Sequence, residues 1–226
     1  MCSRRRVSWS IGSCRRRRPA RTASWKRRWR PDAGAIPGSQ VYGRAVATNW
    51  YCALLRGIGP GNPNMRNDKL RAVFAGLGFD GVVSVLSSGN LVFATDDDAS
   101  TLEDRIQRAL QDELGIGGGT IIRSRDELQA LVDTDPFAGR EHGRESYLTA
   151  TFLKYPSELA ESLAELDGAS VSLVGYDRAA RAVLAVSDHT TSSGPEFMTT
   201  LERRFGKDIT TRTWLTVTRI LARFPN

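Results

Sequence analysis

Cysteine and histidine are scarce in this 226-residue chain, which contains three cysteines and two histidines. Cys2 and Cys14 lie near the N-terminus and Cys52 stands alone in an apolar run, so no disulfide framework is expected. His142 and His189 have no other Cys or His at ligand spacing, which argues against a structural zinc site or a His-based catalytic triad. We therefore expect no metal site and no cofactor, and we interpret Cys52 as a buried core thiol.

Long apolar runs are also missing, since no stretch approaches the roughly 18 consecutive apolar residues that suggest a membrane-spanning helix. The apolar segments have the length of strands, and a composition of 40% hydrophobic and 25% charged residues is that of a globular protein. These features predict a soluble, cytoplasmic protein that does not interact with membranes.

Acidic residues are nearly absent from residues 1–48, which contain 13 Lys or Arg and a single Asp. Of the 32 basic and 25 acidic residues in the chain, 19 and 24 follow residue 48, so the rest of the protein is mildly acidic. The alkaline isoelectric point therefore describes the N-terminal segment. The part expected to fold lacks the bulk positive charge that would attract nucleic acid.

Three interpretations of this basic segment stay open. The first, which we favour, is a disordered extension, because periodic structure begins only near Asn49. The second is an arm that contacts nucleic acid, with arginines neutralising phosphates and Trp9, Trp25 and Trp29 stacking on bases. The third is an organelle transit peptide; an export signal is not expected, because no apolar stretch follows Arg6. Nucleic acid is thus a partner only through this segment.

Residues 49–124 predict elements in the order β-α-β-β-α-β. Apolar runs indicate strands at residues 50–55, 82–86, 91–94 and 120–123. The turn Ser87-Ser88-Gly89-Asn90 joins the second and third strands, since Gly89 and Asn90 supply the positive φ that a tight turn requires. Leu70, Val73, Phe74 and Leu77 predict a helix. Leu102, Ile106, Leu110 and Leu114 predict another.

Helix ends are predicted from capping residues. The first helix has Asn64 as N-cap and Gly78 as its stop. The second has a capping box of Ser100 and Glu103 and ends at Gly115.

Residues 125–146 predict a linker that contains a short helix, with Ser124 and Glu127 as its capping box. The pattern of the first half then returns in residues 147–226. Strands are expected at residues 147–154, 171–174 and 182–186, a helix begins at Pro156, and two final helices begin at Ser193 and at about Thr213.

Together these elements predict an α+β fold of two ferredoxin-like βαββα(β) lobes in tandem, each with an antiparallel sheet, preceded by a disordered basic tail. The expected organisation is a tail at residues 1–48, a first lobe at 49–124, a linker at 125–146, and a second lobe with its C-terminal helix at 147–226.

One edge of the first lobe is predicted to bind an anion. In a β-α-β-β unit the first two strands are parallel, so Arg56, at the end of the first, should neighbour the turn Ser88-Gly89-Asn90 at the end of the second. The first helix begins at this edge, where its free N–H groups favour a phosphate or carboxylate. The guanidinium of Arg56 equally suits a structural carboxylate or carbonyl, and both interpretations stay open.

The chain also contains three separated blocks, Tyr51–Ile58, Ser88–Phe93 and Thr211–Val217, with Asp135-Pro136-Phe137 between them. Together they resemble the family called Domain of Unknown Function 1697, found widely in bacteria. The resemblance covers about residues 50–224, implies the paired ferredoxin-like fold, and brings no established activity. This chain lacks the lysine common in the family's first loop, and has Thr213 where the family usually has Asn.

The candidate ligand-binding residues are Arg56, Gly57, Asn62, Ser88, Gly89, Asn90, Arg212 and Trp214. Arg212 is expected at the start of the last helix, where a cation opposes the helix dipole and calls for an acidic partner or a bound anion. Trp214 also suits a place in the core, or between the lobes. No two carboxylates occur at a defined separation on one rigid element, so no catalytic residue is predicted. The alternatives to anion binding are a non-catalytic protein-interaction module and nucleic-acid binding through the tail.

Overall fold

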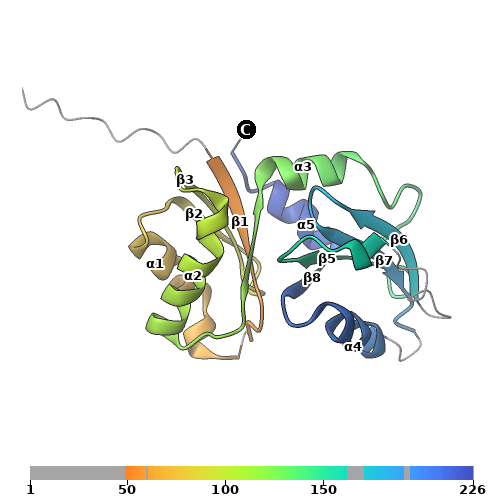
Figure 1. Ribbon diagram of the computed structural model, residues 1–226, viewed down its shortest axis with the longest axis horizontal. Coiled ribbons are helices and arrows are strands. Elements are labelled where there is room, and N and C mark those ends of the chain that lie inside the picture. Colours follow the sequence, from red (N-terminus) through yellow and green to blue (C-terminus); the bar gives the residue numbers. More distant parts are fainter. Residues whose placement is uncertain (1–48, 60, 162–170, 191–193, 226) are drawn as a thin grey trace, which may run out of the picture. The chain divides into compact units, whose positions relative to one another are not determined.

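The computed structural model describes residues 49–59, 61–161, 171–190 and 194–225 (Figure 1). The predicted disordered tail, most of the helix expected after Pro156, and the expected N-cap Ser193 lie outside the described residues.

Two four-stranded antiparallel sheets confirm the predicted α+β fold. The first contains β1 (Asn49–Leu55), β2 (Asp80–Val85), β3 (Asn90–Thr95) and β4 (Thr120–Ser124), in the order β2-β3-β1-β4. The second contains β5 (Tyr147–Leu153), β6 (Val171–Asp177), β7 (Ala182–Ser187) and β8 (Ile209–Thr213), in the order β6-β7-β5-β8. The two sheets therefore share one topology, with equivalent strands in equivalent places.

Helices connect and cover these strands. The α-helices are α1 (Asn67–Gly76), α2 (Ala99–Leu114), α3 (Arg125–Asp133), α4 (Gly194–Phe205) and α5 (Trp214–Leu221), and two short 3₁₀ helices are η1 (Pro63–Met65) and η2 (Glu158–Glu161). We call β1–β4 with α1 and α2 the first lobe, and β5–β8 with α4 the second lobe. Both belong to one compact unit of the chain.

Alternate side chains of β1 enter two different cores. Tyr51, Ala53 and Leu55 pack with residues of α1 and α2 on one face of the first sheet. Cys52 and Leu54 point to the other face and pack with residues of the second sheet, α3 and α5. Because both faces are covered, β1 reads as a continuous apolar run rather than an alternating one.

The second sheet is covered in the same way. Ala150 and Phe152 of β5 enter the core that is shared between the lobes, whereas Leu153 packs on the opposite face with Phe197 and Leu201 of α4. Figure 1 shows α1 and α2 on the outer face of the first sheet and α4 beside the second.

The predicted helical stripes are confirmed, but two of the predicted caps are wrong. Leu102, Ile106 and Leu110 of α2 are fully buried, and Ser124 and Glu127 form the expected capping box of α3. The N-cap of α2, however, is Asp98, whose carboxylate accepts from the N–H of Ser100. Glu103 instead accepts from the N–H of Ile122 in β4, at 3.0 Å.

At α1, the N-cap position is Arg66, which makes no side-chain capping bond, and not Asn64. Asn62 supplies a cap one element earlier, because its side chain accepts from the N–H of Asn64 at the start of η1. The stops are as expected: Gly78 and Gly115 both have positive φ, 82° and 70°.

Strand β8 was not predicted as a separate element. Its sequence is Ile-Thr-Thr-Arg-Thr, without an apolar run, and it pairs antiparallel with β5. Arg212 was therefore wrongly expected at a helix start: it lies in β8, and the N-cap of α5 is Thr213, whose hydroxyl accepts from the N–H of Thr216.

Candidate functional site

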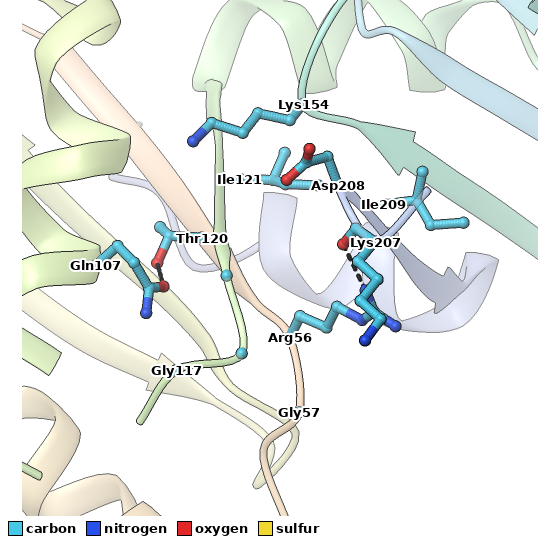
Figure 2. A pocket seen from close by; sticks show the side chains of 12 residues that line it. Arg56, Gly57, Gln107, Gly117, Thr120, Ile121, Lys154, Lys207, Asp208 and Ile209 are labelled. Carbon is cyan, nitrogen blue, oxygen red and sulfur yellow. Dashed lines mark hydrogen bonds between the residues drawn. The ribbon is translucent and has the colours of Figure 1, made fainter. Parts of the chain in front are cut away.

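A pocket of about 450 Å³ lies between the two lobes (Figure 2). The first lobe lines it with Arg56 and Gly57 after β1, Gln107 of α2, and the segment 117–121 that leads into β4. The second lobe contributes Lys154, which follows β5, and the segment 207–209 that leads into β8. This volume is in the range of pockets that hold small molecules.

The lining segments are equivalent positions of the two lobes. The N–H of Leu55 donates to the carbonyl of Gly89 at 2.8 Å, and the N–H of Leu153 donates to that of Arg181 at 2.9 Å. One residue later, the N–H of Arg56 donates to the carbonyl of Gly119 at 2.9 Å. In the second lobe, the N–H of Lys154 donates to the carbonyl of Asp208 at 2.8 Å.

The edge strands β4 and β8 are also equivalent, since each pairs with the first strand of its sheet. The segment entering β4 therefore corresponds to the segment entering β8, and both contribute to the same pocket. Equivalent segments of the two lobes therefore line the pocket.

Three cations and one carboxylate, Asp208, line the pocket, and two of the cations make contacts across the lobes. Arg56 donates from Nη2 to the Glu202 carboxylate of α4 at 2.7 Å, and from Nη1 to the carbonyl of Lys207. Lys154 donates to Asp104 of α2 at 3.1 Å and lies 3.8 Å from the Glu103 carboxylate. Figure 2 shows Lys154 and Arg56 entering from different sides.

Water reaches the carboxylate partner in both of these ion pairs. The Glu202 side chain is 44% exposed and that of Asp104 is 75% exposed, so solvent screens both pairs. Exposed pairs of this kind contribute about 0.2–1 kcal/mol. A bound anion would therefore compete for Arg56 against a weakly held partner, whereas Lys154 also faces Glu103, whose side chain is only 15% exposed.

Lys154 is protonated at neutral pH. Partial burial lowers its pKa, but the hydrogen bond that Lys154 donates to Asp104 and the nearby charges of Glu103 and Asp104 outweigh burial, so the pKa is raised. Glu103 behaves differently: burial, its largest influence, raises the pKa of that carboxyl, although the Ile122 N–H and the Lys154 charge act against it.

Glycine is required at one point of the pocket wall. A Cβ atom on Gly118 would lie 2.0 Å from the carbonyl oxygen of Arg56, well inside contact distance. The backbone of the 117–119 segment can thus approach the end of β1 only because the side chain is absent. Beside it, the Thr120 hydroxyl donates to Gln107 at 3.1 Å, which fixes both side chains (Figure 2).

The predicted site residues are brought together only in part. The turn Ser88-Gly89-Asn90 does neighbour the end of β1, since Gly89 accepts from the N–H of Leu55 and has φ 76°. The positive φ expected at Asn90 is wrong, because Asn90 begins β3 and the other positive φ of this hairpin belongs to Leu86, at 60°. Arg56 and Gly57 line the pocket. The guanidinium of Arg56, however, pairs with a carboxylate and a carbonyl of the second lobe, the structural role left open by the sequence.

Asn90 and Arg212 form a buried contact beneath this edge. Arg212 donates from Nε to the Asn90 side chain and from Nη2 to the carbonyls of Leu55 and Ser88, at 2.7 and 3.3 Å. The compensation expected for Arg212 is therefore supplied by neutral oxygens, and no carboxylate contacts it among the described residues. Burial lowers the pKa of Arg212 to about 10, so it remains protonated at neutral pH.

Trp214 and Asn62 lie apart from the pocket lining. Trp214 packs against the core shared by the lobes and meets Phe137 edge-on, with ring centroids 5.0 Å apart. Asn62 is exposed and caps η1.

Sequence reasoning missed Lys154, Lys207 and Gly118. Lys154 had one available signal, because it follows the first strand of the second lobe as Arg56 follows the first strand of the first lobe. Lys207 and Gly118 carried none, because Lys207 reaches Arg56 only through the packing of the lobes, and Gly118 reaches it through the pairing of β4 with β1.

The described lining of the pocket contains no histidine and no cysteine. Within residues 49–225, as far as they are described, no three His, Cys, Asp or Glu side chains gather where they would hold a metal ion. Both histidines lie elsewhere, against the ring of Tyr147. None of the described helices is long and apolar enough to cross a membrane.

Comparisons with known proteins agree with this fold. The structure is similar to that of the conserved bacterial protein SP0830 from Streptococcus pneumoniae, with a TM-score of 0.58, 18% sequence identity, and coverage of 77% of this chain and 98% of the other. At this identity the likeness shows the fold alone. No curated protein matches the chain. Residues 49–178, more than half of the chain, match the family described as protein of unknown function DUF1697. The chain therefore belongs to the DUF1697 family.

Proposed function

We propose that this protein binds a small anionic ligand, bearing phosphate or carboxylate, in the pocket between its lobes. The observation that carries the proposal is the convergence of Arg56, Lys154 and Lys207 on one pocket of about 450 Å³. These three cations from two lobes outnumber the one carboxylate of the lining, Asp208, so the pocket favours an anion held by charge-assisted hydrogen bonds.

The wall of the pocket adds backbone groups to these cations. The 117–119 segment is all glycine, so a ligand can approach its main chain without meeting side chains. Gln107 and Thr120 are fixed by their mutual hydrogen bond and provide neutral polar groups that would orient a ligand.

Lys207 gives the sharpest test. Its ammonium makes no hydrogen bond or ion pair in the described structure, so replacing it should change ligand affinity without changing stability. Lys207→Ala should leave the thermal midpoint of the free protein unchanged, and should reduce the rise in midpoint that phosphates or carboxylates produce. Lys69→Ala is the matched control, since Lys69 is exposed on α1 and lies outside the pocket lining.

The measurement is a thermal-shift screen of the full chain against nucleotides, sugar phosphates and carboxylic acids, repeated on both variants. Anions that bind the basic N-terminal segment would affect both variants alike, so only the difference between them reports on the pocket. If no compound raises the midpoint more in the parent than in Lys207→Ala, the pocket is not an anion site.

We also propose a cytoplasmic location. Cys52, the single cysteine within the described residues, is a free thiol, as expected in a reducing compartment. Fractionation of cells that express the full chain tests this; recovery in the membrane or exported fraction would contradict it.

A further inference from the structure

Two cations of the pocket lining, Arg56 and Lys154, occupy equivalent places in the two lobes. Arg56 and Lys154 each follow the first strand of their sheet by one residue, and each donates its N–H to the residue before the fourth strand, at 2.9 and 2.8 Å. Both side chains line the same pocket. The repeat of the fold therefore supplies one cation from each side of a single cavity.

The two charges are nevertheless held apart. Lys154 is drawn to Asp104 on α2, which belongs to the first lobe. Arg56 is drawn to Glu202 on α4, which belongs to the second lobe. Figure 1 shows α2 and α4 on different sheets, and Figure 2 shows Lys154 near the Ile121 end and Arg56 near the Gly117 end of the segment 117–121, with Asp208 at a level between them.

A single small anion could satisfy both cations only by drawing each away from its carboxylate partner. A ligand with two charged groups can reach each cation separately, without bringing Arg56 and Lys154 together. The cavity volume is also that of a whole small molecule rather than of one ion.

From this arrangement we infer that the ligand carries two separate anionic groups, one bound by Arg56 together with Lys207 and the other bound by Lys154. This inference rests on the proposed function. The carbonyl of Lys207 accepts from Arg56, which places Lys207 beside Arg56 and gives this end of the pocket a second cation. The ligand class is thus a bis-anion: a dicarboxylate, a diphosphate, or a molecule with one carboxylate and one phosphate.

Calorimetric titration of the full chain with matched mono- and bis-anions tests this, at constant ionic strength. The probes are acetate against malonate, succinate, glutarate and adipate, and inorganic phosphate against pyrophosphate. One bis-anion should bind about tenfold or more tightly than its mono-anion, because the second contact forms at high effective concentration.

Variants then assign the two ends. Arg56→Ala and Lys154→Ala should each reduce the bis-anion affinity to the mono-anion level, while Lys69→Ala should leave it unchanged. Thermal midpoints of the free variants establish that each is folded, and Lys154→Arg, which keeps the charge, should retain most of the affinity.

The outcomes distinguish the two-group ligand from the anion pocket itself. Equal binding of mono- and bis-anions, or loss of affinity in only one of Arg56→Ala and Lys154→Ala, would overturn the two-group ligand and leave the anion pocket standing. Binding of no probe above the level seen with Lys207→Ala would overturn both.

Discussion

Arg123 and Arg212 occupy equivalent positions in the two sheets, and each donates hydrogen bonds to the opposite lobe. Arg123 of β4 lies opposite Cys52 of β1, and Arg212 of β8 lies opposite Ala150 of β5. Arg123 donates to the carbonyls of Ala180 and Leu153 in the second lobe.

Arg212 makes the reciprocal contacts, donating to the carbonyls of Ser88 and Leu55 in the first lobe. In each lobe the acceptors are the end of the first strand and the hairpin between the second and third. Two buried guanidinium groups therefore fix the lobes together and, with them, the walls of the pocket.

Removing Arg212 should strongly destabilise the protein. Arg212→Ala leaves the oxygens of Leu55 and Asn90 without this charged donor and opens a cavity, so we expect a loss of at least about 3 kcal/mol in the free energy of unfolding. Denaturant unfolding followed by circular dichroism measures it. Arg219→Ala, at an exposed arginine of α5, is the control and should change stability by less than about 0.5 kcal/mol.

Arg212→Met separates volume from hydrogen bonding. It fills most of the space but provides no donor, so we expect a loss between those of the alanine variant and the parent. A loss of under about 0.5 kcal/mol in Arg212→Ala would show that the cross-lobe bonds contribute little.

Gly118→Ala should disturb the pocket wall. Its added methyl would meet the carbonyl of Arg56, a backbone atom that cannot rotate away, so the segment has to move at a cost of about 1–3 kcal/mol. Gly61→Ala adds the same methyl where nothing lies within 4 Å and serves as the control. Equal thermal midpoints for the two variants would contradict the close approach.

Cys52 should be inert to thiol reagents while the protein is folded. Burial, its largest influence, raises the pKa of the Cys52 thiol to about 12, so the reactive thiolate is on the order of one part in ten thousand at pH 8. Its side chain is also fully buried. Peptide mapping after a short iodoacetamide pulse should find Cys52 unmodified in the native protein and modified in guanidinium. Rapid native labelling at Cys52 would show that the core opens readily.

Glu103 should make a pH-dependent contribution to stability. Because burial raises its pKa in the folded state, folding favours the protonated carboxyl. The contribution is fully present below the unfolded pKa and is lost as pH rises through the folded one. Glu103→Gln keeps an oxygen for the Ile122 N–H but removes the titration, so its stability relative to the parent should increase as pH rises from about 4 to about 7.

Unfolding curves of both proteins across that pH range provide the measurement. Asp126→Asn, which alters an exposed carboxyl in the first turn of α3, is the control. A stability difference between Glu103→Gln and the parent that stays constant with pH would show that the Glu103 pKa is not shifted.

Local patterns predicted most of the elements, because the face that a residue presents depends on its immediate neighbours. The stripe Leu102, Ile106 and Leu110 identified α2, and Ser124 with Glu127 identified the start of α3. Where a distant group competes, the local motif failed. Glu103 was expected to cap its own helix, but it accepts from Ile122, 19 residues later.

The sequence by itself determined the amphipathic helices and apolar strands of the two lobes, the tight turn at Gly89 and the position of Arg56 at the end of β1. Tertiary structure alone decided that Ile209–Thr213 is a strand, because a segment of threonines and one arginine becomes β8 only by pairing with β5. It also decided that Lys154 and Lys207 share a pocket with Arg56. These residues are about 100 and 150 positions apart from Arg56 in the chain, so no local periodicity links them, and only the packing of one lobe on the other brings their charges together.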